Sequence, residues 1–172
     1  QPDTEDNRKF REAFLATDMT ENSGVVSRIV RSLKRYPLPI HGVFTLSDNF
    51  LVTVSAVATE LGLPTCPISA YETAVDKYRS RQLQDDDGQT VKVGSLTELE
   101  SLMTSHGIHG PAFSPSYPVI VKPTKGWSSE CVAKVNDEVE LFYAVGKACG
   151  RHRGSAVIES YVEGPEIDVN FI

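Results

Sequence analysis

The spacing of apolar and polar positions predicts three helices in the first third of the chain. Residues 23–36 repeat apolar side chains at i, i+3, i+4 and i+7, the spacing of an amphipathic helix, and Ser23 is the expected N-cap. A shorter helix is expected over residues 5–16. A third is expected within residues 47–62, ending at Gly62, because glycine commonly terminates helices.

A short β-rich run at residues 40–46 lies between two of these helices, and residues 63–69 are expected to form a short strand or a connector. An order of strand, helix and strand with short loops is typical of a parallel sheet covered by helices. The first third is therefore expected to contribute part of a parallel α/β sheet.

The middle of the chain is expected to begin with one long helix over residues 70–84. Residues 89–93 alternate between apolar and polar side chains, as a strand does. Ser95 and Glu98 have the spacing of a capping box, which predicts the start of another helix.

Two groups of potential metal ligands in this region are interpreted as surface features. The three aspartates of residues 85–88 are expected to form a solvated helix end, since a metal site needs more converging oxygen atoms. His106 and His109 are three residues apart, but the surrounding glycines and proline predict a surface loop rather than a helical metal site.

The last third alternates between strands and one helix. The helix is expected over residues 137–149, with Asn136 as its cap. The expected strands are residues 117–123, 131–135, 155–162 and 167–172.

Composition narrows the class of protein. The chain has 172 residues, 40% of them hydrophobic, and a formal net charge of -6. No basic block is present, so neither a nucleic acid nor an anionic membrane is an expected partner. No apolar run approaches the ~20 residues that a membrane-spanning helix needs. The three widely spaced cysteines are expected to be reduced thiols, which predicts a cytoplasmic protein.

The segment YPVIVKPTKGWSSECVAKV, residues 117–135, places Lys122 at the end of an apolar strand. Burying an unpaired ammonium is costly, so a nearby anion is expected. Gly126, Ser128 and Ser129 can offer backbone N–H groups and hydroxyls to phosphate oxygens. A surface lysine before a flexible hairpin would explain the same residues, and the segment is not a P-loop.

The segment VIESYVEGPE ends a second apolar strand with an acid, Glu159, and has another acid, Glu166, after Gly164 and Pro165. Backbone groups of such a connector can bind the edge of an adenine ring, and a carboxylate a few residues later can accept hydrogen bonds from ribose hydroxyls.

Three features follow one another along the chain: Lys77, then YPVIVKP with its small-residue loop, and then VIESYVEGPE. This ordered set resembles the ATP-grasp superfamily, and the resemblance covers residues 24–172. The similarity is greatest to the carboxylate-amine ligase branch, which includes L-amino-acid ligases and carnosine synthase. The resemblance implies an α/β fold, in which a partial pre-ATP-grasp α/β layer precedes the first (lid) α+β subdomain. It assigns residues 1–67 to the preceding domain, 68–116 to connecting helices and 117–172 to a truncated lid.

The resemblance also implies roles for individual residues. Lys77 and Lys122 match lysines that contact the nucleotide phosphates, and residues 125–129 match the loop that closes over them. Residues 159–162 match the adenine-binding connector, which uses backbone groups, and Glu166 matches the acid that binds ribose. The predicted ATP-binding set is Lys77, Lys122, Lys125, Gly126, Ser128, Ser129, Glu159, Ser160, Tyr161, Val162 and Glu166.

Such ligases use ATP and Mg²⁺ to join a carboxylate to an amine through an acyl phosphate, and the expected substrates are amino acids. The magnesium ligands are expected outside this chain, which is interpreted as an inactive fragment with half of the ATP site. Trp127 and Glu130 depart from the family loop, since a bulky ring and an acid stand near the expected phosphates.

Two alternatives stay open. The chain could be a non-catalytic descendant of the ATP-grasp fold that binds a nucleotide or a protein partner. It could also be an unrelated α/β domain whose lysines lie at the surface. The sequence leaves open whether the chain forms a homo-oligomer.

Overall fold

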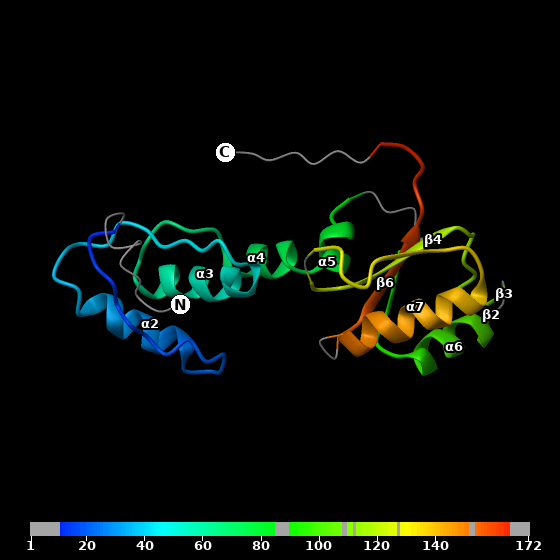
Figure 1. The fold of residues 1–172 in the computed structure, drawn as a ribbon, viewed down its shortest axis with the longest axis horizontal. Helices are drawn as coiled ribbons and strands as arrows, with labels where there is room; N and C mark the ends of the chain where they lie inside the picture. The colour runs from blue at the N-terminus through cyan, green and yellow to red at the C-terminus, as the bar shows by residue number, and fades with distance from the viewer. Residues whose placement is uncertain are drawn as a thin grey trace. The chain divides into compact units, whose positions relative to one another are not determined.

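The computed structural model describes residues 11–84, 90–107, 110–111, 113–126, 128–151 and 154–165. The chain divides into two compact units, residues 1–72 and 73–172, which are described one at a time (Figure 1). Within the described residues, no helix has both the length and the apolar character needed to cross a membrane.

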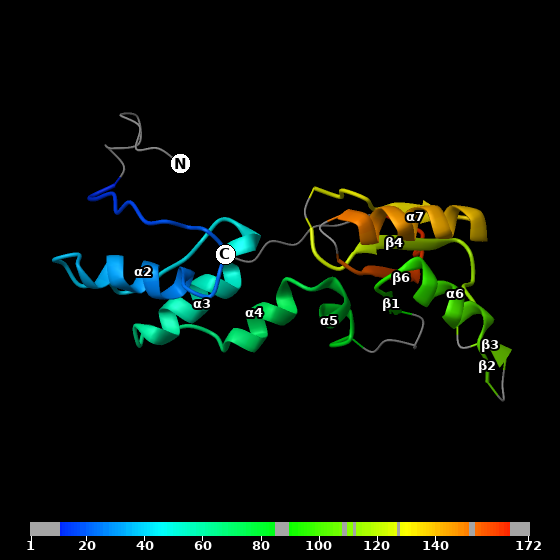
Figure 2. The same cartoon turned by 90° about the horizontal axis from the view of Figure 1, so that it is seen from below.

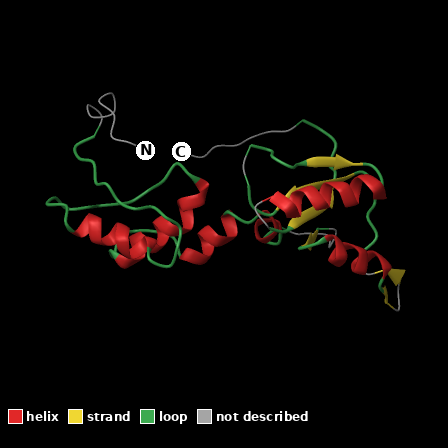
Figure 3. Cartoon of the chain, turned by 60° about the horizontal axis from the view of Figure 1, so that its bottom comes forward, coloured by secondary structure: helices red, strands yellow, loops and turns green. Residues whose placement is uncertain are grey.

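The first unit is built from helices (Figure 3). They are α2 (Val25–Lys34), the 3-10 helix η1 (Asp48–Phe50), α3 (Leu51–Glu60) and α4 (Ile68–Ala74), which runs across the boundary of the unit. Helices α2 and α3 pack together, with Val30 and Val57 buried. The helices predicted within residues 23–36 and 47–62 are therefore confirmed.

Other expectations for the first unit are wrong. Residues 11–16 are not helical, and residues 40–46 form no strand in the described part of this unit. A strand is stable only when a neighbouring strand pairs its backbone N–H and C=O groups. Here Phe44 and Leu46 are 84% and 97% exposed instead. The parallel α/β layer is thus not seen in residues 11–72, while residues 5–10 lie outside the described part.

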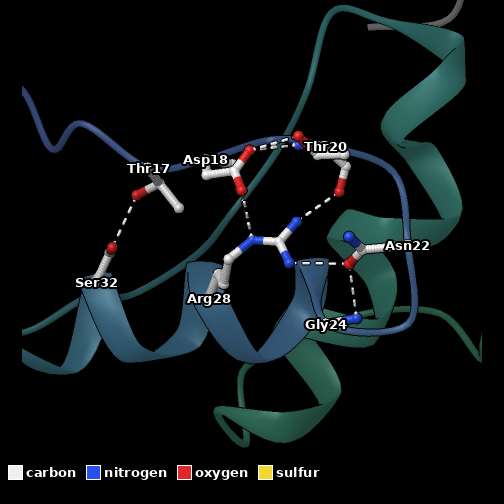
Figure 4. Close-up of polar contacts among 7 residues, drawn as sticks. All are labelled: Thr17, Asp18, Thr20, Asn22, Gly24, Arg28 and Ser32. Carbon is white, nitrogen blue, oxygen red and sulfur yellow. Dashed lines mark hydrogen bonds and ion pairs between the residues drawn. The ribbon is translucent and has the colours of Figure 1, made fainter.

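A hydrogen-bonded loop precedes α2 in place of the predicted serine cap (Figure 4). Arg28 donates from Nε to the Asp18 carbonyl at 2.9 Å and from Nη1 to Asn22 Oδ1 at 2.8 Å. Asn22 Oδ1 also accepts the N–H of Gly24, which is the residue that precedes the helix. These side chains satisfy backbone groups that have no partner in regular secondary structure.

The long helix predicted over residues 70–84 is two helices, α4 and α5 (Lys77–Arg81). Asp76 interrupts it with extended backbone angles, φ -114° and ψ 110°, and its carboxylate accepts the N–H groups of Tyr78 and Arg79 at 3.0 and 3.1 Å. Asp76 is therefore the N-cap that begins α5. The aspartates of residues 85–88 lie outside the described part of the chain.

The second unit contains a four-stranded sheet. Its strands are β1 (Val91–Val93), β4 (Val119–Pro123), β5 (Ala133–Val135) and β6 (Ala156–Ser160). Their order is β1-β6-β4-β5, and every pair is antiparallel. The predicted strands in residues 89–93, 117–123, 131–135 and 155–162 are confirmed, and the strand predicted at 167–172 lies outside the described residues.

A second, two-stranded sheet contacts helix α6 (Leu96–Thr104). It pairs β2 (His106–Gly107) with β3 (Gly110–Pro111). His106 is thus in a short strand rather than a loop, and His109 is not among the described residues.

Two helices, α6 (Leu96–Thr104) and α7 (Glu138–Gly150), cover one face of the four-stranded sheet (Figures 1 and 2). The buried core between these layers includes Val93, Leu99, Val119, Val121, Val135, Leu141, Val145 and Ile158. This packing accounts for the apolar spacing of the last third, since each strand and each helix turns one apolar side toward the core.

Side-chain caps begin both of these helices. Ser95 Oγ accepts the Glu98 N–H at 3.1 Å, as the capping box predicts, and Glu98 Oε2 accepts the N–H of Gly94 at 2.7 Å. The cap of α7 is Asp137, which accepts the Glu140 N–H at 2.9 Å. Asn136, the predicted cap, is one residue too early.

Candidate functional site

The register of β4 and β6 places Lys122 and Glu159 on the same face of the sheet. Ile120 is paired with Glu159, and Lys122 with Val157, so Lys122 and Glu159 are diagonal neighbours. Because side chains alternate along a strand, both point away from the face that contributes Val121 to the core under α6 and α7.

Lys122 and Glu159 form an ion pair between Nζ and Oε1. Glu159 is only 7% exposed, and the Lys122 side chain is 21% exposed. The anion that the strand-end lysine requires is thus present within the chain. A ligand phosphate would have to compete with this carboxylate for the ammonium.

Arg81 is a second partner of Glu159. Its Nε and Nη2 donate to Glu159 Oε2 at 3.3 and 3.1 Å. Arg81 is absent from the site predicted from sequence, although a signal was present, because residues four apart share one face of a helix and Arg81 follows Lys77 by four. The break at Asp76 is what makes these two residues the first and last of α5.

Lys77 is held against the loop after β4. Its backbone N–H donates to the Thr124 carbonyl and its Nζ donates to the Gly126 carbonyl, each at 2.9 Å. The N–H of Thr124 in turn donates to Ser155, just before β6, at 2.8 Å. These contacts bring the start of α5 and the predicted phosphate loop together.

The loop itself has an unusual backbone. Gly126 has φ 143°, and the non-glycine residues Ser128, Ser129 and Cys131 have φ between 53° and 57°, in the left-handed region. L-amino acids rarely adopt this conformation, and several such residues together are a feature of functional loops. The side chains of Lys125, Ser128 and Ser129 are exposed, so a ligand can reach them.

Glu130 is paired with Arg151, whose Nη2 lies 2.7 Å from its Oε2. Both side chains are a little under half exposed. This pairing reduces the repulsion that the acid would exert on a phosphate in the loop. Trp127 lies outside the described residues.

The connector after β6 is only partly packed. The Tyr161 N–H donates to the Pro118 carbonyl at 3.2 Å, and Lys134 Nζ lies 3.7 Å from the centre of the Tyr161 ring. Ser160 and Val162 are exposed. Glu166, the predicted ribose ligand, is outside the described part of the chain.

The donor set of this site suits a nucleotide phosphate better than a metal ion. Two lysine side chains and a loop with exposed serine hydroxyls are partners for phosphate oxygens. Among the described residues, no group of three or more His, Cys, Asp or Glu side chains converges as metal ligands would.

A large pocket lies in the first unit, and none of the predicted site residues lines it. Its volume is about 620 Å³, and its walls are mostly apolar side chains from residues 14–17 and 19, α2, residues 43–45, Phe50 and α3. The polar cluster around Glu159 in the second unit is the better candidate for phosphate chemistry.

Comparison with known families supplies matches at both ends of the chain. The ATP-grasp N-terminal domain matches residues 1–65, and the D-ala D-ala ligase C-terminus matches residues 107–172. The chain belongs to the ATP-grasp superfamily. The second match spans Lys122, the loop after β4 and the connector after β6.

Individual relatives agree with this membership. The ATP-grasp enzyme fsqD of Aspergillus fumigatus is 33% identical over 167 residues, which are 95% of this chain and 27% of that protein. D-alanine–D-alanine ligase B of Pseudomonas syringae is 30% identical over 102 residues, 59% of this chain and 30% of that protein. This ATP-grasp chain thus spans less than a third of the length of these relatives.

A solved structure supports the fold. The L-amino acid ligase from Bacillus licheniformis has a TM-score of 0.60 and 24% identity, with 87% of this chain and 33% of that chain covered. At this identity, the likeness of the ATP-grasp chain to the solved structure concerns the fold alone.

Proposed function

We propose that the protein containing this chain is an ATP-dependent carboxylate-amine ligase, and that the second unit carries part of its ATP site. The observation that carries the proposal is the convergence of Lys77, the loop of residues 124–131 and the Lys122–Glu159 pair around the ends of β4 and β6. Membership of the ATP-grasp superfamily supports it.

In this proposal, Lys77 and Lys122 bind the nucleotide phosphates. The loop side chains of Lys125, Ser128 and Ser129, with the backbone of Gly126, cover them. Ammonium groups and N–H donors stabilise the charge that develops on a phosphoryl group during its transfer, and a closed loop keeps water away.

The connector of residues 159–162 binds adenine in the proposal, through backbone groups of Ser160 and Val162 on either side of Tyr161. Glu166 binds the ribose. The exposure of Ser160 and Val162 is compatible with this role, since a ligand can reach them.

ATP would transfer its γ-phosphoryl group to the carboxylate and leave as ADP, and an amine would then displace phosphate from the acyl phosphate to form an amide bond. We propose amino acids as the acid and the amine, because the relatives include proteins named D-alanine–D-alanine ligase and L-amino acid ligase. Magnesium would be held by residues other than those described here. The division at residues 67 and 116 and the cytoplasmic location stay predictions.

ATP titration of the full-length protein tests the proposal, with wild type compared with Lys122→Ala. The affinity for ATP is expected to fall about tenfold or more, because charge-assisted contacts to phosphate are lost. Lys147→Ala is the control, because Lys147 is an exposed lysine on α7. Equal affinity in wild type and Lys122→Ala would remove Lys122 from the site.

One observation favours the second candidate, a non-catalytic descendant that binds a nucleotide or a protein. Glu159 already neutralises Lys122, which is compatible with a structural ion pair. Product analysis with ATP and mixed amino acids separates the two candidates. Binding of ATP without ADP formation by the full-length protein would favour the non-catalytic candidate.

A further inference from the structure

Glu159 is a buried carboxylate with two cationic partners, and only one of them belongs to the predicted ATP site. We propose that Arg81 is a positioning residue, which shares the Glu159 carboxylate with Lys122 and so frees the Lys122 ammonium for a nucleotide phosphate. The inference rests on the proposed function for its nucleotide, while the sharing of the carboxylate is a property of the chain alone.

The two cations use different oxygens of Glu159. Lys122 pairs with Oε1, whereas Arg81 donates to Oε2 from both Nε, at 3.3 Å, and Nη2, at 3.1 Å. Departure of Lys122 would therefore leave the hydrogen bonds of Arg81 intact.

Burial makes the second cation necessary. Glu159 is 7% exposed, and a carboxylate left without a partner in such a place carries a large desolvation penalty. If Lys122 were the sole partner, its movement to a phosphate would leave this charge unpaired, and the ion pair would oppose nucleotide binding. With Arg81 in place, the charge of Glu159 stays balanced after Lys122 has left.

Arginine is well suited to this task. Its guanidinium is always charged, and its planar fork donates several hydrogen bonds in fixed directions. A third contact orients it here, since Nη1 donates to Gln84 Oε1 at 2.7 Å. Arg81 thus has a defined position on Glu159 without a contribution from Lys122.

The position of Arg81 on α5 links it to the predicted phosphate loop. Lys77, at the other end of the same five-residue helix, donates to the Gly126 carbonyl. The short helix α5 therefore positions the predicted phosphate loop through Lys77 and contacts the Glu159 carboxylate through Arg81. This arrangement depends on the cap at Asp76, which begins the helix at Lys77.

The first experiment measures the reactivity of Lys122 without nucleotide. The full-length protein is treated with an acetylating reagent, and modification of Lys122 is followed by mass spectrometry, with exposed Lys147 as internal reference. Arg81→Met is expected to slow the acetylation of Lys122 severalfold, because Glu159 then holds Lys122 alone. Arg81→Lys keeps the charge and is expected to restore most of the rate.

Two further variants complete this experiment. Arg79→Met removes the same charge from an exposed position of the same helix and should leave the Lys122 rate unchanged. In a Glu159→Gln background, Lys122 is no longer held, so Arg81→Met should have no further effect. Equal Lys122 rates in wild type and Arg81→Met would overturn the inference, whether or not the protein binds ATP.

The second experiment compares ATP with adenosine, which lacks phosphates. Arg81→Met is expected to weaken ATP binding about tenfold and adenosine binding much less. In the Glu159→Gln background, Arg81→Met should no longer weaken ATP binding, and a double-mutant cycle measures this coupling. The same loss in both backgrounds would overturn the inference, because Arg81 would then act independently of Glu159.

The two experiments separate the two proposals. A wild-type protein that does not bind ATP overturns the proposed function. The acetylation of Lys122 then still decides whether Arg81 loosens the hold of Glu159 on Lys122.

Discussion

The ammonium nitrogen of Lys77 lies 2.9 Å from the carbonyl oxygen of Gly126, although 49 residues separate them in the sequence. This hydrogen bond joins the start of α5 to the loop that follows β4. A second hydrogen bond joins the same segments, since the backbone N–H of Lys77 donates to the Thr124 carbonyl. The loop therefore has a fixed attachment at its beginning.

Loss of the Lys77 side chain should loosen this loop. Lys77→Met is expected to raise the rate of tryptic cleavage after Lys125 by up to about tenfold, because a hydrogen bond from a charged donor is lost and local opening becomes easier. Cleavage is followed over time by mass spectrometry. Lys147→Met is the control, and an unchanged rate in Lys77→Met would contradict this account of the loop.

The cap at Asp76 should contribute measurably to stability. Asp76→Ala removes the acceptor of two backbone N–H groups and is expected to lower the free energy of unfolding by ~1 kcal/mol. Asp76→Asn keeps a side-chain oxygen and should cost much less. Urea unfolding of the three proteins provides the comparison. Equal losses in both variants would show that the carboxylate charge, rather than the cap, is what matters.

The core of the second unit should depend on Leu141. Leu141→Ala is expected to lower the free energy of unfolding by about 2–5 kcal/mol, because a fully buried side chain leaves a cavity. Val139, two residues earlier on α7, is 81% exposed, so Val139→Ala should stay within about 0.5 kcal/mol. Comparable losses in the two variants would contradict the assignment of Leu141 to the buried face of α7 and Val139 to the exposed face.

The Cys149 thiol should respond to pH differently in the folded and unfolded chains. Burial raises the pKa of this thiol above its ordinary value of 9.0, against a smaller lowering by the Ala156 backbone. The folded protein thus favours the neutral thiol. The contribution of this thiol to the free energy of unfolding is fully present below the pKa that the thiol has in the unfolded chain. It is lost as the pH rises through the pKa of the thiol in the folded chain.

Alkylation tests this direction in a variant whose other cysteines, Cys66 and Cys131, are replaced by serine. The pH at which labelling of Cys149 reaches half its maximal rate is expected to be higher in buffer than in urea. A half-maximal pH that is the same or lower in the folded protein would mean that burial does not control this thiol.

The Glu130–Arg151 pair should matter little for stability. Both side chains are nearly half exposed, so solvent and salt screen the interaction, and a double-mutant cycle is expected to give a coupling below ~1 kcal/mol. The pair is expected instead to affect how tightly a negatively charged ligand such as ATP binds. Arg151→Ala should weaken ATP binding more than Glu130→Gln does, because only the former leaves an unpaired acid beside the loop. The reverse order in ATP titrations would contradict this role.

Local sequence signals predicted several elements well because their causes are local. The alternation in residues 89–93 and 117–123 indicated strands, and the spacing in residues 23–36 indicated a helix, as the structure has them. The capping box at Ser95 is likewise a contact between residues three apart. Such features depend on side-chain direction and on backbone groups within one or two turns.

The errors arose where a distant or competing contact decides the outcome. Residues 40–46 have strand-forming side chains, but no neighbouring strand pairs with them in the described part of the first unit. The helix predicted over residues 70–84 fails because the Asp76 carboxylate bonds the N–H groups that would otherwise continue the helix. Propensity is a weak guide when such alternatives exist.

The amino-acid sequence alone determined the strand-end lysine, the small-residue loop and the acidic connector, together with the family to which their order belongs, because these are properties of residue type and spacing. Only the tertiary structure decided that Glu159 is buried between Lys122 and Arg81. The register of β4 against β6 and the position of α5 create that contact, and both depend on packing between segments that are 37 and 78 residues apart.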